Sequence, residues 1–380
     1  MRLPTMKSGN PGKGGSVAAP RPFPRGAWLA ALAALAACGS AAGAPEVVGA
    51  GASFPAPAVE AWGQAFARGH EARVVYRSVG SGEGIRRATA RTADFAMTDV
   101  PLTQAELRQD DLMQFPVVAG AVVPVVNVPG VGDGALKLTG PVLARIYLGQ
   151  ITRWNEPPLQ ELNPGLALPE LPIQVVHRAD GSGTSFVFTY YLSTVEPQWR
   201  EALGIGSRLH WPVGTGAKGN EGVAAAVRAA SGSIGYVEYT YAVQYGLAAA
   251  QLLNRAGAYL RAGEPGVRAA LAAARWSRPG YYEVLVDRGC AGCWPIVGVS
   301  FALVHRRQDS LEDGAATLEF LRWVLEHGAQ AALELQYVPL EDARLVARIE
   351  SSWNGIRDGR GRNVWRPHGG ASRPPAQETP

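Results

Sequence analysis

The sequence predicts an α/β fold, and three observations lead to that prediction. Runs of strand length alternate along the chain with segments of helical periodicity. Glycine-rich turns follow several of these runs, and open α/β sheets bind their ligands at such strand ends. The length of 380 residues and a hydrophobic content of 47% are sufficient for two domains with apolar cores. Alternating strands and helices therefore indicate an α/β architecture.

The expected strands are short and apolar, apart from the long β-branched run 115–128. Helices are expected where apolar residues recur at helical spacing, as at Ala58, Trp62 and Phe66. In chain order, the predicted strands are 47–49, 73–77, 94–97, 115–128, 173–176 and 296–305. The predicted helices are 57–68, 85–89, 141–148, 186–192, 220–230 and 315–326. No internal repeat is visible in the sequence.

Residues 1–37 have the pattern of an export signal. Basic residues precede the apolar run 27–37, which is too short to span a bilayer. The run ends in Leu35-Ala-Ala-Cys38-Gly39, which resembles a bacterial lipoprotein signal with Cys38 as the lipidated first residue of the mature chain. The alternative is an ordinary secretory signal that is cut near Ala42. Residues 38–45 are interpreted as a tether, and 366–380, rich in Pro, Gly and Ser, as a frayed tail.

The charge distribution argues against a basic surface of the kind that binds nucleic acid. The whole chain carries a formal charge of +4. Five of its 36 basic residues lie in the signal, so 31 remain against 32 acidic residues, a net charge of −1. These five are Arg2, Lys7, Lys13, Arg21 and Arg25. We therefore expect no nucleic-acid partner.

Cys290 and Cys293 form a single Cys-Ala-Gly-Cys pair. In the oxidising compartment that an export signal implies, such a pair favours a local structural disulfide. A thioredoxin-like redox motif is the alternative, but no βαβ pattern surrounds the pair. A zinc site would need two further ligands, and no His or Cys lies at the required spacing, so no metal is expected.

Residues 178–185 have the composition of a compact anion receptor. Arg178 supplies a planar guanidinium, and the glycines, Ser182 and Thr184 stand directly before a helical segment. A helix start presents unpaired N–H groups and the positive end of a dipole, and glycines let a ligand approach the backbone closely. A plain N-capped helix after a turn would also explain Asp180 and Ser182, but not the whole set.

Three more turns of ligand-binding type follow predicted strands. They are Gly49-Ala-Gly-Ala-Ser-Phe-Pro55, Gly80-Ser-Gly82 and Met97-Thr-Asp-Val-Pro101. Each alone is weak evidence, because any turn uses Gly, Ser and Asp. Several helix starts with Ser or Thr in one exported α/β protein make a common anion site the better interpretation.

At this point the chain resembles the substrate-binding proteins of bacterial phosphate ABC transporters. The string Arg178-Ala-Asp-Gly-Ser-Gly-Thr-Ser-Phe-Val-Phe188 is highly specific for them. The matching stretches run in family order over about 46–355. They are 49–57, 94–102, 114–116, 146–149, 163–166, 178–188, 218–220 and 234–239.

The resemblance implies a type II periplasmic-binding-protein fold, in which two lobes, each a mixed sheet flanked by helices, close on phosphate at a hinge. The first lobe would comprise 46–127 and 295–357, and the second 128–294. The family has Thr where Ser53 stands, which retains the hydroxyl, and a small residue where Glu83 could oppose an anion. The implied phosphate contacts are Ser53, Phe54, Ser81, Asp99, Arg178, Ser182, Gly183 and Thr184. Asp180 is expected either to pair with Arg178 or to cap the helix.

Asp99 decides which oxyanion fits. An ionised carboxylate only accepts hydrogen bonds, so it favours a ligand that carries a proton. Phosphate offers an O–H near neutral pH and sulfate does not, so sulfate would leave two acceptors facing each other at a cost of about 1–3 kcal/mol. A simpler role for Asp99 is to cap the turn before Pro101.

Enzymatic function is not expected. The motif at 214–219 matches G-x-G-x-x-G but lacks a clear preceding strand, and we interpret it as a helix-entry loop. No P-loop or G-x-S-x-G motif is present, and the histidines lack metal-ligand spacing. The resemblance implies a monomeric receptor, without cofactor, that delivers phosphate to an ABC transporter permease from outside the cytoplasmic membrane. Alternatives are a binder of sulfate, molybdate or a phosphonate, and an exported phosphate-ester hydrolase.

Overall fold

The computed structural model describes residues 45–366, in which one continuous sheet organises two lobes. The main path of that sheet follows the order β2-β1-β3-β13-β4-β8-β6-β7. The strands of the first lobe are β1 (Glu46–Gly51), β2 (Arg73–Ser78), β3 (Phe95–Thr98) and β13 (Ile296–His305). Those of the second lobe are β6 (Gln174–Arg178), β7 (Thr215–Ala217) and β8 (Ser233–Glu238).

The long strand β4 (Leu112–Asn127) belongs to both lobes. Its residues 112–121 pair antiparallel with β13, and its residues 122–127 pair antiparallel with β8. The partner changes between Ala121 and Val122. All of β4 except its last residue is buried, which explains why its sequence is an almost unbroken apolar run. The lobe boundaries 46–127, 128–294 and 295–357 stay a prediction.

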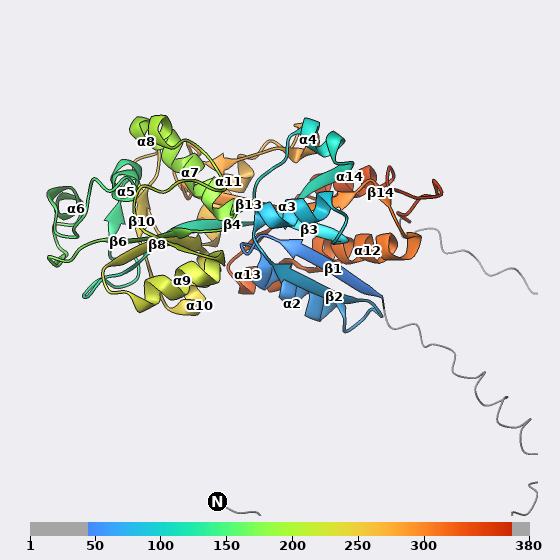
Figure 1. The fold of residues 1–380 in the computed structure, drawn as a ribbon, viewed down its shortest axis with the longest axis horizontal. Helices are drawn as coiled ribbons and strands as arrows, with labels where there is room; N and C mark the ends of the chain where they lie inside the picture. The colour runs from blue at the N-terminus through green and yellow to red at the C-terminus, as the bar shows by residue number, and fades with distance from the viewer. Residues whose placement is uncertain (1–44, 367–380) are drawn as a thin grey trace, which may run out of the picture. The chain divides into compact units, whose positions relative to one another are not determined.

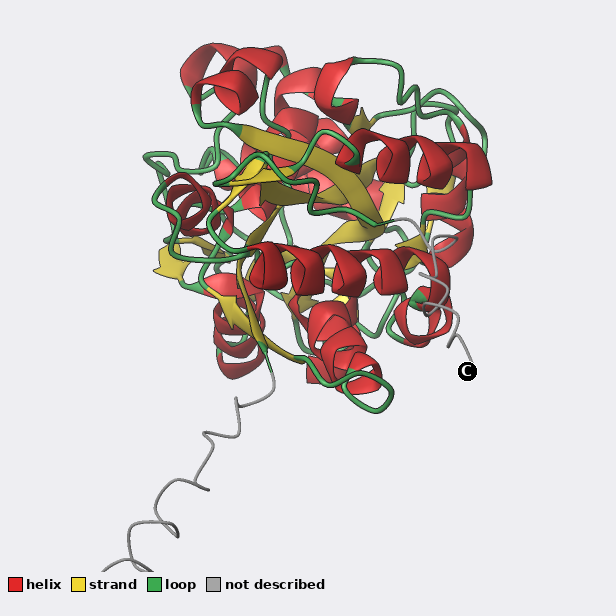
Figure 2. Cartoon of the chain, turned by 90° about the vertical axis from the view of Figure 1, so that its right-hand side faces the viewer, coloured by secondary structure: helices red, strands yellow, loops and turns green. Residues whose placement is uncertain are grey.

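Helices pack around the strands in both lobes (Figures 1 and 2). Those of the first lobe are α2 (Ala56–Phe66), α3 (Ser81–Thr89), α4 (Gln104–Gln109), α12 (Leu311–His327), α13 (Ala329–Glu334) and α14 (Ala343–Trp353). Those of the second lobe are α5 (Gly140–Tyr147), α6 (Pro157–Leu162), α7 (Gly183–Val195), α8 (Pro197–Ala202), α9 (Gly219–Ala229) and α10 (Tyr239–Tyr245). Helix α11 (Glu264–Ala272) falls in the range predicted for the second lobe, but its Arg268 pairs with Glu341 of the first lobe. Among the described residues, none of these helices has the length and apolar character needed to cross a bilayer.

Short elements complete the fold. Strands β9 (Ala248–Ala249) and β15 (Val338–Pro339) pair with β4, and β12 (Leu285–Val286) pairs with β13. A separate sheet contains β5 (Lys137–Leu138), β10 (Gln251–Leu253) and β11 (Tyr259–Leu260). The remaining pieces are β14 (Arg307–Gln308), β16 (Arg357–Asp358) and the 3₁₀ turn η1 (Pro279–Tyr281).

The predicted elements exist, but several begin or end elsewhere. The prediction 296–305 matches β13 at both ends, whereas the helix expected at 186–192 extends over Gly183–Val195. The helix expected at 85–89 already begins at Ser81. Strand β8 and helices α4, α6, α8, α10, α11, α13 and α14 were not anticipated. The predictions for 1–37, Cys38, the tether up to residue 44 and the tail from 367 lie outside the described residues.

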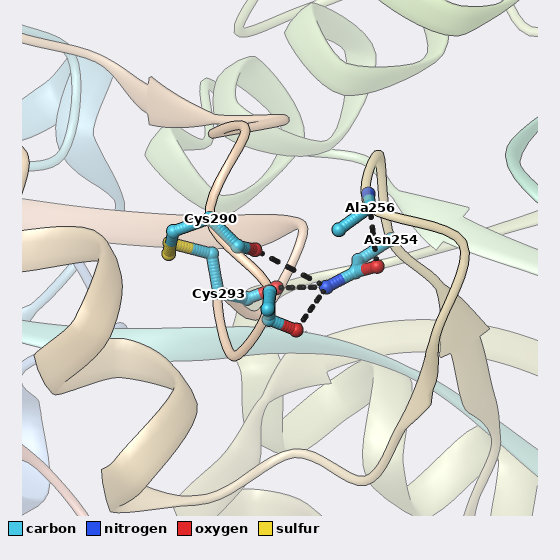
Figure 3. Close-up of a disulfide and its surroundings, with 5 residues drawn as sticks. Asn254, Ala256, Cys290 and Cys293 are labelled. Carbon is cyan, nitrogen blue, oxygen red and sulfur yellow. Dashed lines mark hydrogen bonds between the residues drawn. A yellow bond between two sulfur atoms is a disulfide. The ribbon is translucent and has the colours of Figure 1, made fainter.

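A disulfide joins Cys290 and Cys293, whose Cα atoms are 5.3 Å apart (Figure 3). Asn254 holds the loop that the disulfide closes. Its side-chain amide donates hydrogen bonds to the carbonyls of Cys290 (3.4 Å), Ala291 (2.8 Å) and Cys293 (3.3 Å). These bonds tie the loop to the chain after β10, where the Oδ1 of Asn254 also accepts from the N–H of Ala256 at 3.1 Å.

Candidate anion-binding site

The predicted ligand-binding turns meet where strands of both lobes end. The turn after β1 leads into α2, the turn after β2 into α3, and the turn after β6 into α7. The N–H of Gly82 donates to the carbonyl of Gly181 at 2.9 Å, which joins two of these turns across the lobes. Such helix starts carry positive partial charge, so together they favour an anion between them.

The start of α7 is an N-capped helix in which several hydrogen-bond donors have no acceptor among the described residues. The Oγ of Ser182 accepts from the N–H of Ser185 at 3.0 Å, so Ser182 is the cap and its own O–H stays available as a donor. Gly183 donates its N–H to Ser81 Oγ at 3.1 Å. The buried N–H groups of Thr184 and Phe54 find no acceptor among the described residues. Buried N–H groups are nearly always paired, so these two indicate a ligand.

Arg178 is buried and held by Asp180. Its Nε donates to Asp180 Oδ1 at 2.8 Å and its Nη2 to Oδ2 at 2.5 Å, a two-pronged pair that fixes the guanidinium plane. Its Nη1 lies 3.4 Å from Thr184 Oγ1. Burial opposes ionisation of Asp180, but the hydrogen bonds and charge of Arg178 outweigh it and lower the pKa of Asp180. Asp180 therefore pairs with Arg178, and the helix-cap alternative is wrong because Ser182 fills that role.

Asp99 is 2% exposed and lies against the start of α7. Ser300 donates a hydrogen bond to Asp99 Oδ1, and Ser81 Oγ lies 3.5 Å from Oδ2. Burial raises the pKa of Asp99 to about 7, although Ser300, Arg178 and Ser81 oppose that rise. Asp99 therefore changes its charge near neutral pH. Its carboxyl oxygens accept no N–H from the turn before Pro101 among the described hydrogen bonds, which disfavours a simple turn-capping role.

Asn220, at the start of α9, joins the two lobes at the site and was not predicted as a contact. Its backbone N–H and its Nδ2 donate to Ser53 Oγ at 3.1 and 2.9 Å. Its Nδ2 also lies 3.2 Å from Thr184 Oγ1, and its Oδ1 accepts from the N–H of Glu238 at 3.0 Å. The sequence pointed to Asn220 only through the family-matching stretch Lys218-Gly-Asn220, which overlaps the motif interpreted as a helix-entry loop. In the structure that motif contains β7 and leads into α9.

Glu83 does not oppose an anion with an unbalanced charge. Its carboxylate accepts from Arg86 at 2.5 and 2.7 Å and from Arg87 at 2.9 Å. Hydrogen bonds from these arginines lower the pKa of Glu83 to about 2. The carboxylate is thus engaged along the exposed side of α3, and its charge is balanced locally.

The structure thus brings the predicted residues together in one buried polar cluster. Hydrogen bonds link Ser53 through Asn220 to Thr184 and Arg178, and link Asp99 through Ser81 to Gly183. Ser182 caps the helix that carries Gly183 and Thr184, and Phe54 follows Ser53. The cluster combines hydroxyl and N–H donors with one guanidinium and one carboxyl group of variable charge. Among the described residues, no group of acidic, His or Cys side chains is arranged to hold a metal ion.

Solved structures share this fold. The protein resembles the phosphate-binding protein of Stenotrophomonas maltophilia with a TM-score of 0.61 and 21% identity, covering 81% of this chain and 94% of that chain. A human phosphate-binding apolipoprotein gives a TM-score of 0.64 and 20% identity, covering 80% of this chain and 94% of that chain. These likenesses confirm the two-lobed binding-protein fold.

Sequence comparison identifies the family to which the chain belongs. The family model described as a PBP superfamily domain matches residues 36–327. The phosphate-binding protein PstS of Pasteurella multocida is 42% identical over 324 residues, 85% of this chain and 94% of that protein. That of Methanocaldococcus jannaschii is 34% identical over 302 residues, 73% of this chain and 78% of that protein. The chain therefore belongs to the PBP superfamily and, within it, to the PstS family of phosphate-binding proteins.

Proposed function

We propose that this protein captures inorganic phosphate outside the cytoplasmic membrane and delivers it to the permease subunits of an ABC transporter for import. The observation that carries the proposal is the buried carboxyl of Asp99 beside the N–H and hydroxyl donors of the start of α7. A site for a fully deprotonated anion would need only donors. A carboxyl among them gives a proton on the ligand a partner.

Binding would follow from donors that are already in place. Phe54 and Thr184 would offer N–H groups, Ser53, Ser81 and Ser182 hydroxyls, and Arg178 its guanidinium. Because Asp180 holds the guanidinium rigidly, little side-chain entropy is lost when an anion arrives. Contacts such as Asn220 to Ser53 join the lobes in the closed form, and a hinge at β4 would release them.

Calorimetric titration of the purified protein with phosphate and with sulfate tests the proposal. We expect tight binding of phosphate, and weak binding of sulfate at pH 8 because ionised Asp99 accepts a hydrogen bond that sulfate cannot donate. Preference for sulfate, molybdate or a phosphonate over phosphate would contradict the assignment of phosphate as the ligand. Turnover of a generic phosphate ester by the pure protein would favour the hydrolase alternative.

The proposal includes export and attachment through Cys38, with the lobes 46–127 plus 295–357 and 128–294 closing as a monomer. Mass spectrometry of the native protein would detect a lipid on an N-terminal Cys38. A mature chain that begins near Ala42 would instead indicate an ordinary secretory signal. Light scattering with and without phosphate would test the monomeric state.

A further inference from the structure

Three tyrosine hydroxyls lie on three consecutive carbonyls of the turn after β1. Tyr76 donates to the carbonyl of Ala52 at 2.7 Å, Tyr241 to that of Ser53 at 2.7 Å, and Tyr337 to that of Phe54 at 2.5 Å. They come from β2, from α10 and from the segment before β15. Burial raises the pKa of each hydroxyl above its ordinary value, so all three remain protonated donors across the physiological range.

Each carbonyl belongs to the same rigid peptide unit as the N–H of the next residue. In a trans unit the N–H points opposite to the C=O, and the described residues contain no cis peptide bond. Tyr76 therefore orients the unit that carries the N–H of Ser53, and Tyr241 the unit that carries the N–H of Phe54. Neither N–H finds an acceptor among the described residues.

From this geometry we propose that Tyr76 and Tyr241 are positioning residues that aim the N–H groups of Ser53 and Phe54 at the bound anion. The inference rests on the proposed phosphate-binding function. A donor on the carbonyl also polarises the peptide unit, which strengthens the N–H on its other side. The hydroxyls thus prepare the turn for an anion without touching it.

The two tyrosines act at different stages of binding. Tyr76 and the turn both lie in the first lobe, so their hydrogen bond is present whether the lobes are open or closed. Tyr241 lies on α10 of the second lobe and reaches the Ser53 carbonyl across the lobes. Its hydrogen bond forms when the lobes close, which ties closure to the alignment of the Phe54 N–H.

Tyr337 provides an internal comparison. It holds the peptide unit between Phe54 and Pro55, and that unit has no N–H because residue 55 is proline. The Tyr337 hydroxyl therefore supports the backbone at the start of α2 without aiming a donor. Tyr147 is a second comparison, since it is fully buried and its hydroxyl has no partner among the described residues.

The test is a set of Tyr→Phe variants of the full chain, each of which removes one hydroxyl. We expect Tyr76→Phe and Tyr241→Phe to weaken phosphate binding about 3- to 10-fold in calorimetry, the effect of one lost hydrogen bond. Tyr337→Phe should lower the urea midpoint yet bind phosphate within about twofold of wild type. Tyr147→Phe should also bind phosphate within about twofold of wild type, and its urea midpoint should stay unchanged. Tyr241→Phe should act mainly by faster phosphate release in stopped-flow fluorescence, because its bond belongs to the closed form.

The outcomes separate the two proposals. Wild-type protein that does not bind phosphate would overturn the proposed function itself. Wild-type protein that binds phosphate, with Tyr76→Phe and Tyr241→Phe binding equally well, would overturn the positioning role alone. Equal weakening by Tyr337→Phe and Tyr241→Phe would also overturn it, because a general loss of turn stability would then explain the effect. Unfolding of each unliganded variant in urea shows whether it folds.

Discussion

The backbone of Gly183 packs directly against the carboxyl group of Asp99. A methyl group at Gly183 would lie 2.6 Å from Asp99 Cβ and 2.5 Å from Ser81 Oγ. This contact brings the start of α7 in the second lobe against β3 and α3 of the first lobe. No side chain larger than hydrogen fits there while the lobes are closed.

We therefore expect Gly183→Ala to weaken phosphate binding about 10- to 100-fold, because overpacking of this kind costs about 1–3 kcal/mol. Calorimetry measures the affinity. The matched control is Gly69→Ala, since a methyl group at Gly69 meets nothing within 4 Å. Equal affinities for both variants would show that closure does not bring Gly183 to Asp99.

Discrimination against sulfate should depend on pH through Asp99. Because the pKa of Asp99 is about 7, the group is ionised at pH 8 and becomes protonated in mild acid. A protonated carboxyl can donate one hydrogen bond to sulfate, so sulfate affinity should rise up to about tenfold per pH unit as the pH falls towards 7, and level off below 7 once the group is protonated. Titrations with sulfate from pH 5.5 to 8.5 measure this dependence.

Two variants complete that test. Asp99→Asn carries a permanent donor, and its sulfate affinity should not change over the same pH range. The control Asp309→Asn alters an exposed carboxylate and should keep the wild-type profile. A flat profile for the wild type would contradict the role of Asp99.

The unliganded protein should be less stable at alkaline pH because of the same group. The folded pKa of Asp99, about 7, lies above the ordinary value of 3.8, so its contribution is fully present below about pH 4 and is lost as pH rises through 7. Urea unfolding at pH 5 and pH 8 should show a smaller loss in Asp99→Asn than in wild type. Identical losses would indicate that Asp99 is not desolvated in the unliganded form.

Asn220 should contribute to affinity through its contacts between the lobes. We expect Asn220→Ala to weaken phosphate binding about tenfold or more, because it removes the Nδ2 bonds to Ser53 and Thr184 and leaves the Glu238 N–H without its acceptor. Asn354→Ala, at the end of α14, is the control. If both variants bind phosphate like wild type, Asn220 is not part of the closed site.

The disulfide should stabilise the fold modestly. A loop of this length gives about 2 kcal/mol by the loop-entropy relation, so Cys290→Ala with Cys293→Ala should lower the free energy of unfolding by about that amount. Reductant should reproduce the loss in wild type and leave the double variant unchanged. A wild-type urea midpoint that is insensitive to reductant would contradict a stabilising role.

Local patterns in the sequence were sufficient for much of the framework. Apolar runs identified β4 and β13, since both strands are buried along nearly their whole length. The glycine, serine and threonine residues around α7 identified a helix start suited to an anion, because capping and free N–H groups arise within a few residues of one another. Strand β8 was missed although the stretch 234–239, which includes most of it, matches the family.

The partners that complete the site depend on the order of strands in the sheet. Ser300 reaches Asp99 over a separation of 201 residues, Tyr241 reaches Ser53 over 188, and Tyr337 reaches Phe54 over 283. Capping rules and hydrophobic periodicity act over one or two turns of chain, so they carry no information about such pairs. The sequence was enough to recognise the candidate anion-binding turns and the family of the chain. Which hydroxyl orients which peptide unit, and how far burial raises the pKa of Asp99, follow from the packing of β1, β3, β13 and α10 in space.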